Sequence, residues 1–173
     1  LRAAANKPGF KPVVMNARVS FDLKSTSVEK NSRNVVGLLP GSETPDEAIV
    51  YMAHWDHLGT HAGETGDNIY NGAVDNATGV AGILEVAEAF RKAPTPPKRS
   101  ILFLAVTLEE SGLLGSKYYV AHPVVPLEKT VAVFNIDALA PIGKAKDVTV
   151  VGKGSSQLED ALDVVLAGQK RKS

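Results

Sequence analysis

The stretch AIVYMA at residues 48–53 is a continuous apolar run that is followed directly by His54. A run of this kind, without alternating polar residues, is typical of a strand that is covered on both faces of a sheet. A second run, ILFLAV at residues 101–106, predicts another buried strand over Ser100–Thr107. Between them, Asn76–Lys92 has apolar residues at helical spacing and ends before a proline-rich segment. The order strand, helix, strand indicates parallel strands joined by a crossover helix.

Further strands and helices are indicated on either side of this unit. Strands are predicted at Lys11–Leu23, Asn34–Leu39, Thr130–Ile136 and Val148–Val151, helices at Leu113–Ala121 and at about Ser156–Leu166, and a loop at Asp56–Gly72. The first of these strands is indicated by alternating apolar residues, from Val13 to Leu23. The whole pattern predicts an α/β sandwich with a mainly parallel core.

Composition limits the classes of function. Lys and Arg number 19, Asp and Glu also number 19, and no basic stripe marks a nucleic-acid face. The chain has no cysteine, which excludes disulfides and thiolate metal sites. No apolar run approaches the roughly 20 residues that a membrane span needs. We therefore expect neither a nucleic acid as partner nor a membrane-spanning segment.

Histidine and carboxylate residues occur where the predicted strands end. His54 and Asp56 follow the strand at 48–53, Glu109 and Glu110 follow the strand that ends near Thr107, Asp137 follows Ile136, and Asp75 precedes the helix that opens at Asn76. In an open α/β sheet, ligands gather beyond the carboxyl ends of the strands. Because separate segments deliver these groups to that one edge, the sequence predicts a binding site there.

A pair of zinc ions explains why these residue types would meet. Zinc accepts imidazole nitrogen and carboxylate oxygen, and two metals about 3.5–4 Å apart need one shared carboxylate. Asp75 is placed to be shared, because the glycines around it permit close approach of the backbone. His54, Glu110 and Asp137 would then be terminal ligands. Each residue alone has an ordinary explanation, such as a surface histidine or a helix N-cap, but their coincidence at one edge favours a metal site.

Two more acidic residues are expected to act beside the ligands. Asp56 lies two residues from His54 in an extended segment, so its carboxylate can hold that imidazole in one tautomer. Glu109 adjoins the expected ligand Glu110 but would point elsewhere, which would leave it free as a general base for a metal-bound water.

At these residues the sequence resembles the co-catalytic zinc aminopeptidases typified by bacterial secreted aminopeptidases and the aminopeptidase Y group. The stretches that carry the likeness are AHWDHLG (53–59), YNGAVDNATGVA (70–81), LEESGLLGS (108–116) and NID (135–137), and SRNVVG (32–37) resembles the family's lead-in strand. The match runs from roughly Asn34 to Asp137, and the order and spacing of the motifs both resemble those of the family.

The resemblance implies a three-layer α/β sandwich with a mixed, mainly parallel sheet. It implies a zinc exopeptidase, most simply an aminopeptidase with a peptide substrate, in a secreted or periplasmic protein. It further implies one zinc on His54 and Asp137, another on Glu110, Asp75 shared between them, Glu109 as base and Asp56 behind His54. The chain, 1–173, would be a single zinc peptidase domain, with a lead-in strand and linker at 1–33 and a metal-binding core at 34–173.

The sequence departs from the family at the second zinc. The family completes the Glu110 side with a histidine well downstream, whereas no histidine follows Asp137 here. We therefore expect an incomplete domain with one zinc or fewer, weak or no peptidase activity, and the remainder of its own domain as a partner. Two tightly held metals would instead mean that one of the other histidines, His57, His61 or His122, replaces the missing ligand.

Two alternatives stay open. A glutaminyl-cyclase-like acyltransferase shares the fold and similar motifs but uses a single zinc, and it would form pyroglutamate rather than release amino acids. A non-catalytic metal-binding remnant is the other alternative. Among hydrolases, the aminopeptidase is the first choice, and a dipeptidase or a carboxypeptidase is the next alternative.

Overall fold

The computed structural model describes residues 2–12, 14–61, 63, 65–140, 143, 145–151 and 153–171. The chain divides into two compact units, Leu1–Asn31 and Ser32–Ser173. The regular element of the first unit is one short helix, α1 (Arg2–Ala5).

The strand predicted at Lys11–Leu23 is wrong. The described residues of this segment have no regular secondary structure, and Val13 lies outside the described residues. The alternating apolar side chains are exposed, Val19 at 82% and Phe21 at 81%. Alternation produces a strand only where a neighbouring strand takes up the backbone hydrogen bonds, and the described residues of the first unit contain no such strand.

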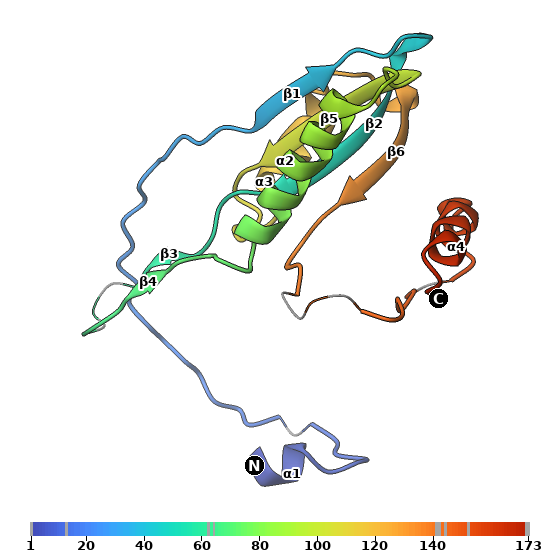
Figure 1. Cartoon of the computed structure of the whole chain (residues 1–173). Coiled ribbons are helices and arrows are strands. Elements are labelled where there is room, and N and C mark those ends of the chain that lie inside the picture. Colours follow the sequence, from blue (N-terminus) through green and yellow to red (C-terminus); the bar gives the residue numbers. More distant parts are fainter. Residues whose placement is uncertain are drawn as a thin grey trace. The chain divides into compact units, whose positions relative to one another are not determined.

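The second unit is built on a four-stranded sheet with the order β1-β5-β2-β6 (Figure 1). Its strands are β1 (Val35–Leu39), β2 (Thr44–His54), β5 (Arg99–Val106) and β6 (Thr130–Asn135). Strand β2 pairs in parallel with β5 on one side and with β6 on the other, while β1 runs antiparallel to β5. The predicted mixed, mainly parallel sheet is confirmed.

Helix α2 (Ala77–Lys92) covers one face of this sheet. On that face Tyr51 of β2 lies between neighbouring strands, with ring centroids 6.2 Å from Phe103 of β5 and 5.1 Å from Phe134 of β6. Phe90, in the last turns of α2, approaches the same tyrosine ring at 6.1 Å. Aromatic pairs at such spacings contribute roughly 0.5–1.5 kcal/mol each beyond their buried area, so this cluster fixes α2 on the sheet.

Helix α3 (Leu114–Ala121) packs on the opposite face. Its Tyr119 joins a buried cluster with Val50 of β2 and with Leu102 and Leu104 of β5. Because side chains alternate between the two faces along a strand, these residues point away from Tyr51 and Phe103. Helices on both faces make the three-layer sandwich that was predicted.

The smaller elements include two differences from the prediction. The loop predicted at Asp56–Gly72 contains a short antiparallel pair, β3 (Gly59–Thr60) and β4 (Ile69–Tyr70), whose strands are too short to give a periodic signal. The strand predicted at Val148–Val151 is wrong, because these residues pair with no strand among those described, and Val151 is 93% exposed. The remaining elements are η1 (Leu127–Lys129) and the predicted last helix, α4 (Leu158–Gly168).

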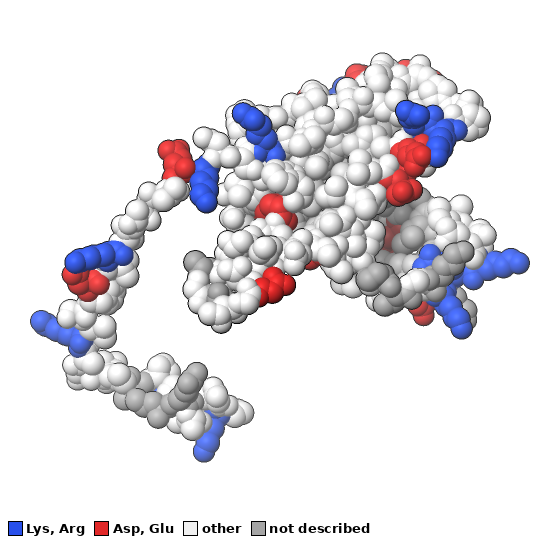
Figure 2. Space-filling model, turned by 60° about the vertical axis from the view of Figure 1, so that its left-hand side comes forward, with Lys and Arg blue, Asp and Glu red and all other residues white. Residues whose placement is uncertain are grey.

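Two surface properties bear on partners. None of the helices within the described residues is long and apolar enough to cross a membrane. On the face of the molecule drawn in Figure 2, Lys and Arg side chains are interspersed with Asp and Glu side chains.

Candidate metal centre

The parallel strands β5, β2 and β6 end at the same edge of the sheet. His54 is the last residue of β2 and is paired in register with Val106, the last residue of β5. Met52 of β2 is paired with Asn135, the last residue of β6. Residues that come after β5 and β6 therefore emerge beside His54, as the strand-end argument requires.

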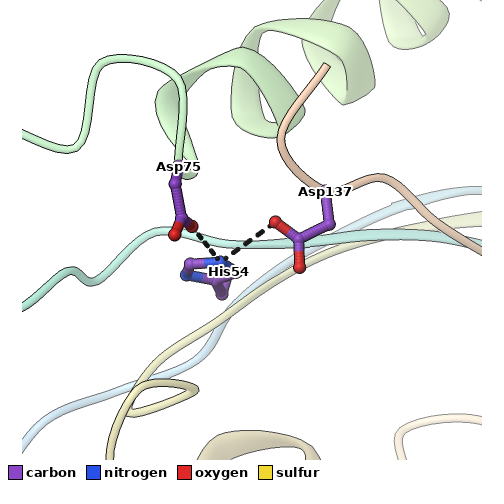
Figure 3. A group of neighbouring side chains, drawn as sticks. All are labelled: His54, Asp75 and Asp137. Carbon is purple, nitrogen blue, oxygen red and sulfur yellow. Dashed lines mark ion pairs between the residues drawn. The ribbon is translucent and has the colours of Figure 1, made fainter. Parts of the chain in front are cut away.

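His54, Asp75 and Asp137 point toward one another from β2, from the segment before α2 and from the segment after β6 (Figure 3). The Nε2 atom of His54 lies 3.0 Å from Asp75 Oδ1 and 3.4 Å from Asp137 Oδ1. The imidazole side chain is only 3% exposed, whereas the two carboxylates are 48% and 44% exposed. One nitrogen and two oxygen donors thus face a common point that solvent can reach.

The other ring nitrogen of His54 lies 3.0 Å from the backbone carbonyl oxygen of Asp56. Burial by itself lowers the pKa of His54, since it disfavours the charged ring. The Asp56 carbonyl and the negative charges of Asp137, Glu109 and Asp56 outweigh burial and raise the pKa above its usual value. In the neutral ring that donates Nδ1–H to the carbonyl, the Nε2 lone pair faces the carboxylates, which is the tautomer that a metal ligand needs.

The carboxylate of Asp56 acts through different atoms from those expected. It lies 3.8 Å from His54 Nδ1, so the nearer partner of the ring is the backbone carbonyl. Its Oδ1 accepts the N–H of Glu109 at 3.1 Å, and its Oδ2 accepts the N–H of Glu110 at 3.4 Å. The side chain of Asp56 therefore positions the Glu109–Glu110 turn that comes after β5.

A second group of donors consists of His57, Asp75 and Glu110, whose nearest ligand atoms all lie within 4.8 Å of one another. Asp75 is common to this group and to the group with His54 and Asp137. The structure thus brings all the predicted ligands to one place and puts Asp75 between them. His57 was named in the sequence only as one of several spare histidines, and its position three residues after His54 is the one signal that singles it out.

Glu109 belongs to neither group of three. Its side chain is half-buried, and its charge is among those that raise the pKa of His54. The carboxylate therefore influences the first group electrostatically without being one of the donors in either group.

Asn76 ties the two sides of the centre together, a role that the sequence did not reveal. It is 2% exposed and caps α2, because its Oδ1 accepts the N–H of Gly79 at 2.9 Å. The same oxygen accepts the N–H of Ala138 at 3.2 Å, and Nδ2 donates to the carbonyl of Ile136 at 2.9 Å. One amide side chain thus joins the segment that carries Asp75 to the segment that carries Asp137.

The close approach of α2 to the end of β6 depends on Gly79. A Cβ atom at this position would overlap the Asn76 side chain and the carbonyl oxygen of Ile136. Glycine has a low helix propensity, so helix formation does not explain its presence in the first turn of α2. The space left by the missing side chain does explain it.

The donor set fits zinc. Catalytic zinc sites take three protein ligands from imidazole nitrogen and carboxylate oxygen and keep one position open. His54, Asp75 and Asp137 supply three such donors around a point that is partly open to solvent. The remaining histidines, His61 and His122, are exposed and belong to neither group, within the part of the chain that the structure describes.

Comparisons with known proteins identify the class. Residues 34–173 match Peptidase family M28, and the chain therefore belongs to this family. The recognition of a zinc aminopeptidase family from the strand-end motifs is thus confirmed.

Individual relatives are similar to this chain. Aminopeptidase NAALADL1 of Rattus norvegicus is 31% identical over 138 residues, which cover 75% of this chain and 17% of that protein. The glutamate carboxypeptidase 2 homolog of Caenorhabditis elegans is 34% identical over 137 residues, which cover 76% of this chain and 16% of that protein. The chain thus spans about one sixth of the length of these relatives.

Among solved structures, the fold is similar to that of BSAP, a zinc aminopeptidase from Bacillus subtilis. The TM-score is 0.62 at 23% identity, and the superposition covers 80% of this chain and 32% of that chain. At this identity the likeness concerns the fold, which confirms the α/β architecture.

Proposed function

We propose that this chain carries the metal-binding centre of a zinc exopeptidase that releases amino acids from the N-termini of peptides. The observation that carries the proposal is the meeting of His54 Nε2 with Asp75 and Asp137 at 3.0 and 3.4 Å, at the edge where parallel strands end. Membership of a peptidase family and an aminopeptidase among the relatives support it.

In the proposed centre His54, Asp75 and Asp137 would hold one zinc ion, and Asp75 and Glu110 would contribute to a second. Zinc bound there supplies the Lewis acidity that makes water a nucleophile near neutral pH. Glu109 takes the proton from the attacking water and then delivers it to the nitrogen of the leaving amine. Asp56 holds the backbone of Glu109 and Glu110 at the distances given above, so that base and ligand keep their places.

The proposal also covers setting and partners. The substrate is a peptide with a free amino terminus, and the protein is secreted or periplasmic, as the family resemblance implies. Because the chain spans 17% of the rat aminopeptidase, we propose the remainder of its own peptidase domain as the partner that completes the substrate pocket. Product analysis with one peptide panel tests this proposal. An aminopeptidase releases the N-terminal amino acid, a carboxypeptidase releases the C-terminal amino acid, and the cyclase alternative forms pyroglutamate.

Replacing Asp75 by asparagine is expected to remove most of the bound zinc, because both donor groups use this carboxylate. The amide keeps the size of the side chain but loses the charge that balances the metal. Zinc per chain, measured after equilibrium dialysis, should fall toward zero, while Asp163→Asn, on an exposed face of α4, should leave it unchanged. Unaltered zinc content in Asp75→Asn would contradict the shared role of Asp75.

A further inference from the structure

The hairpin formed by β3 and β4 is part of the segment that joins two of the expected ligands. This segment leaves β2 at His54 and reaches Asp75 just before α2 begins. Within the hairpin, Gly59 is paired in register with Tyr70. Because both ends of the segment are fixed at the metal centre, the base of the hairpin lies at the rim of that centre.

Tyr70 contacts the centre through His57. The two rings lie edge to face, with centroids 6.3 Å apart and planes at 70°. The Nδ1 atom of His57 lies 2.7 Å from Oε1 of Glu110, which is one of the expected ligands. The imidazole also packs against the backbone of Gly72, where an added Cβ would come within 3.1 Å of the His57 Cβ. One side chain, held in place by packing, thus separates the tyrosine ring from a donor of the centre.

The Tyr70 ring does not cover its neighbour across the hairpin. That neighbour, Gly59, has no side chain, and an aromatic ring opposite a glycine in a sheet can serve to shield it. Here a Cβ added to Gly59 would meet no heavy atom of the described residues within 4 Å, so the ring lies elsewhere. Tyr70 is 42% exposed, and Leu58 and Ile69 beside it are 56% and 57% exposed. Large apolar side chains grouped on one surface mark binding sites, so this surface is available to a ligand.

The charges of this segment decide which kind of side chain it suits. Residues 55–74 include no lysine or arginine, whereas Asp56, Glu64 and Asp67 are acidic. An acidic side chain would therefore find no lysine or arginine partner here, and the carboxylates of the segment would repel it. An apolar side chain can instead remove the exposed apolar surface of the hairpin from water.

We propose that the hairpin is a wall of the substrate site, and that Tyr70 contacts an apolar side chain of the peptide beside the bond that is cleaved. The substrates are then peptides with a large apolar residue at that place, and peptides with glycine or an acidic residue there bind more weakly. This inference rests on the proposed function and deepens it, since it names the substrate class of the same centre.

A purely structural role of Tyr70, as a support for His57, makes a different prediction. Removing a support would disturb the neighbouring ligand Glu110 and weaken the binding of every peptide to the same extent. Removing a contact with the substrate would weaken the binding of apolar peptides alone, because a glycine residue makes no such contact. The preference between side chains therefore separates the two roles.

The test is calorimetry of the full chain, loaded with zinc and titrated with dipeptide amides in which CH₂ replaces the carbonyl of the scissile bond, so that they bind without being cleaved. The analogue with two leucines should bind at least about 10-fold more tightly than those with two glycines or two glutamates. A single methylene group in an apolar pocket is already worth about 10- to 200-fold. Equal affinities would overturn the inference and leave the proposed function intact, whereas no binding of any analogue would contradict both.

Matched tyrosine variants locate the contact. Tyr70→Ala should remove most of the preference for leucine, whereas Tyr70→Phe, which keeps the ring, should retain it. Tyr118→Ala, at an exposed tyrosine on α3 outside both donor groups, is the control and should also retain it. An unchanged preference in Tyr70→Ala, or equal weakening of all three analogues, would overturn the inference.

Fluorine NMR of the unaltered sequence gives a readout that does not depend on the folding of a variant. The chain has four tyrosines, so labelling with 3-fluorotyrosine gives four signals. The leucine analogue should shift the signal of Tyr70, which is identified by its loss in Tyr70→Phe, and should leave that of Tyr118 in place. A Tyr70 signal that does not move at saturating analogue would overturn the inference.

Discussion

Replacing Glu109 by alanine is expected to lower turnover by ~10²–10⁴-fold, the range typical of a general base, while zinc content stays the same. Glu109 lies outside both donor groups, but its charge acts on His54, so its replacement should affect the chemistry at the centre more than the metal content. The loss should appear in kcat rather than in metal affinity. The measurement is peptide hydrolysis by the catalytically active form of the protein, together with zinc per chain in the same sample.

Glu110→Ala is the comparison that makes this result specific. Glu110 is one residue away and belongs to the second donor group, so its replacement should remove metal as well as activity. If Glu109→Ala instead loses zinc in proportion to activity, Glu109 is a ligand and the assignment within the pair is reversed.

The second large effect concerns stability. Gly79→Ala should destabilise the chain by roughly 1–3 kcal/mol or more, because the new methyl group overlaps the Asn76 side chain and the carbonyl of Ile136. Displacing Asn76 also removes the cap of α2, which is worth about 0.5–2 kcal/mol. The free energy of unfolding, measured by urea denaturation of the metal-free chain, should fall accordingly.

Gly82→Ala provides the matched control on the same helix. A Cβ at this position would lie 3.5 Å from its nearest neighbours in Ile136 and Leu139, an ordinary contact distance. Since alanine favours a helix interior over glycine by about 0.5–1 kcal/mol, this variant should be as stable as the parent or more stable. Similar destabilisation by both substitutions would show that the loss of unfolding free energy in Gly79→Ala does not come from the close contact of α2 with the carbonyl of Ile136.

The fold and the candidate ligand set were predictable because their signals are local. The apolar run that ends at His54 specifies a buried strand, and parallel strands bring the residues after their last positions to one edge of the sheet. Glu110 and Asp137 could be proposed for that reason, and Asp75 for its place before a helix with glycines around it, together with the resemblance to a family. The position of a side chain relative to a strand end is thus information that one sequence contains.

The features that were missed depend on contacts between distant segments. Asn76 reads as an ordinary N-cap, and its bonds to Ile136 and Ala138, which lie far along the chain, have no sequence signature. Asp56 was assigned to the right neighbourhood, but its carboxylate turns to backbone amides that only the fold brings near. The strand predicted at Lys11–Leu23 failed for the complementary reason, since alternation indicates a strand but says nothing about whether a partner strand exists.

The hydrogen bonds of the Asn76 side chain link backbone amides near the centre to the binding of metal there. The amide hydrogens of Gly79 and Ala138 share one acceptor, the Oδ1 of Asn76, so both lose a hydrogen bond when that side chain moves away. A ligand lowers the population only of those open forms that cannot bind it. Metal bound by Asp75 and Asp137 is therefore expected to slow deuterium uptake at the amides of Gly79, on α2, and Ala138, on the segment after β6, to the extent that they exchange through openings that separate the two carboxylates.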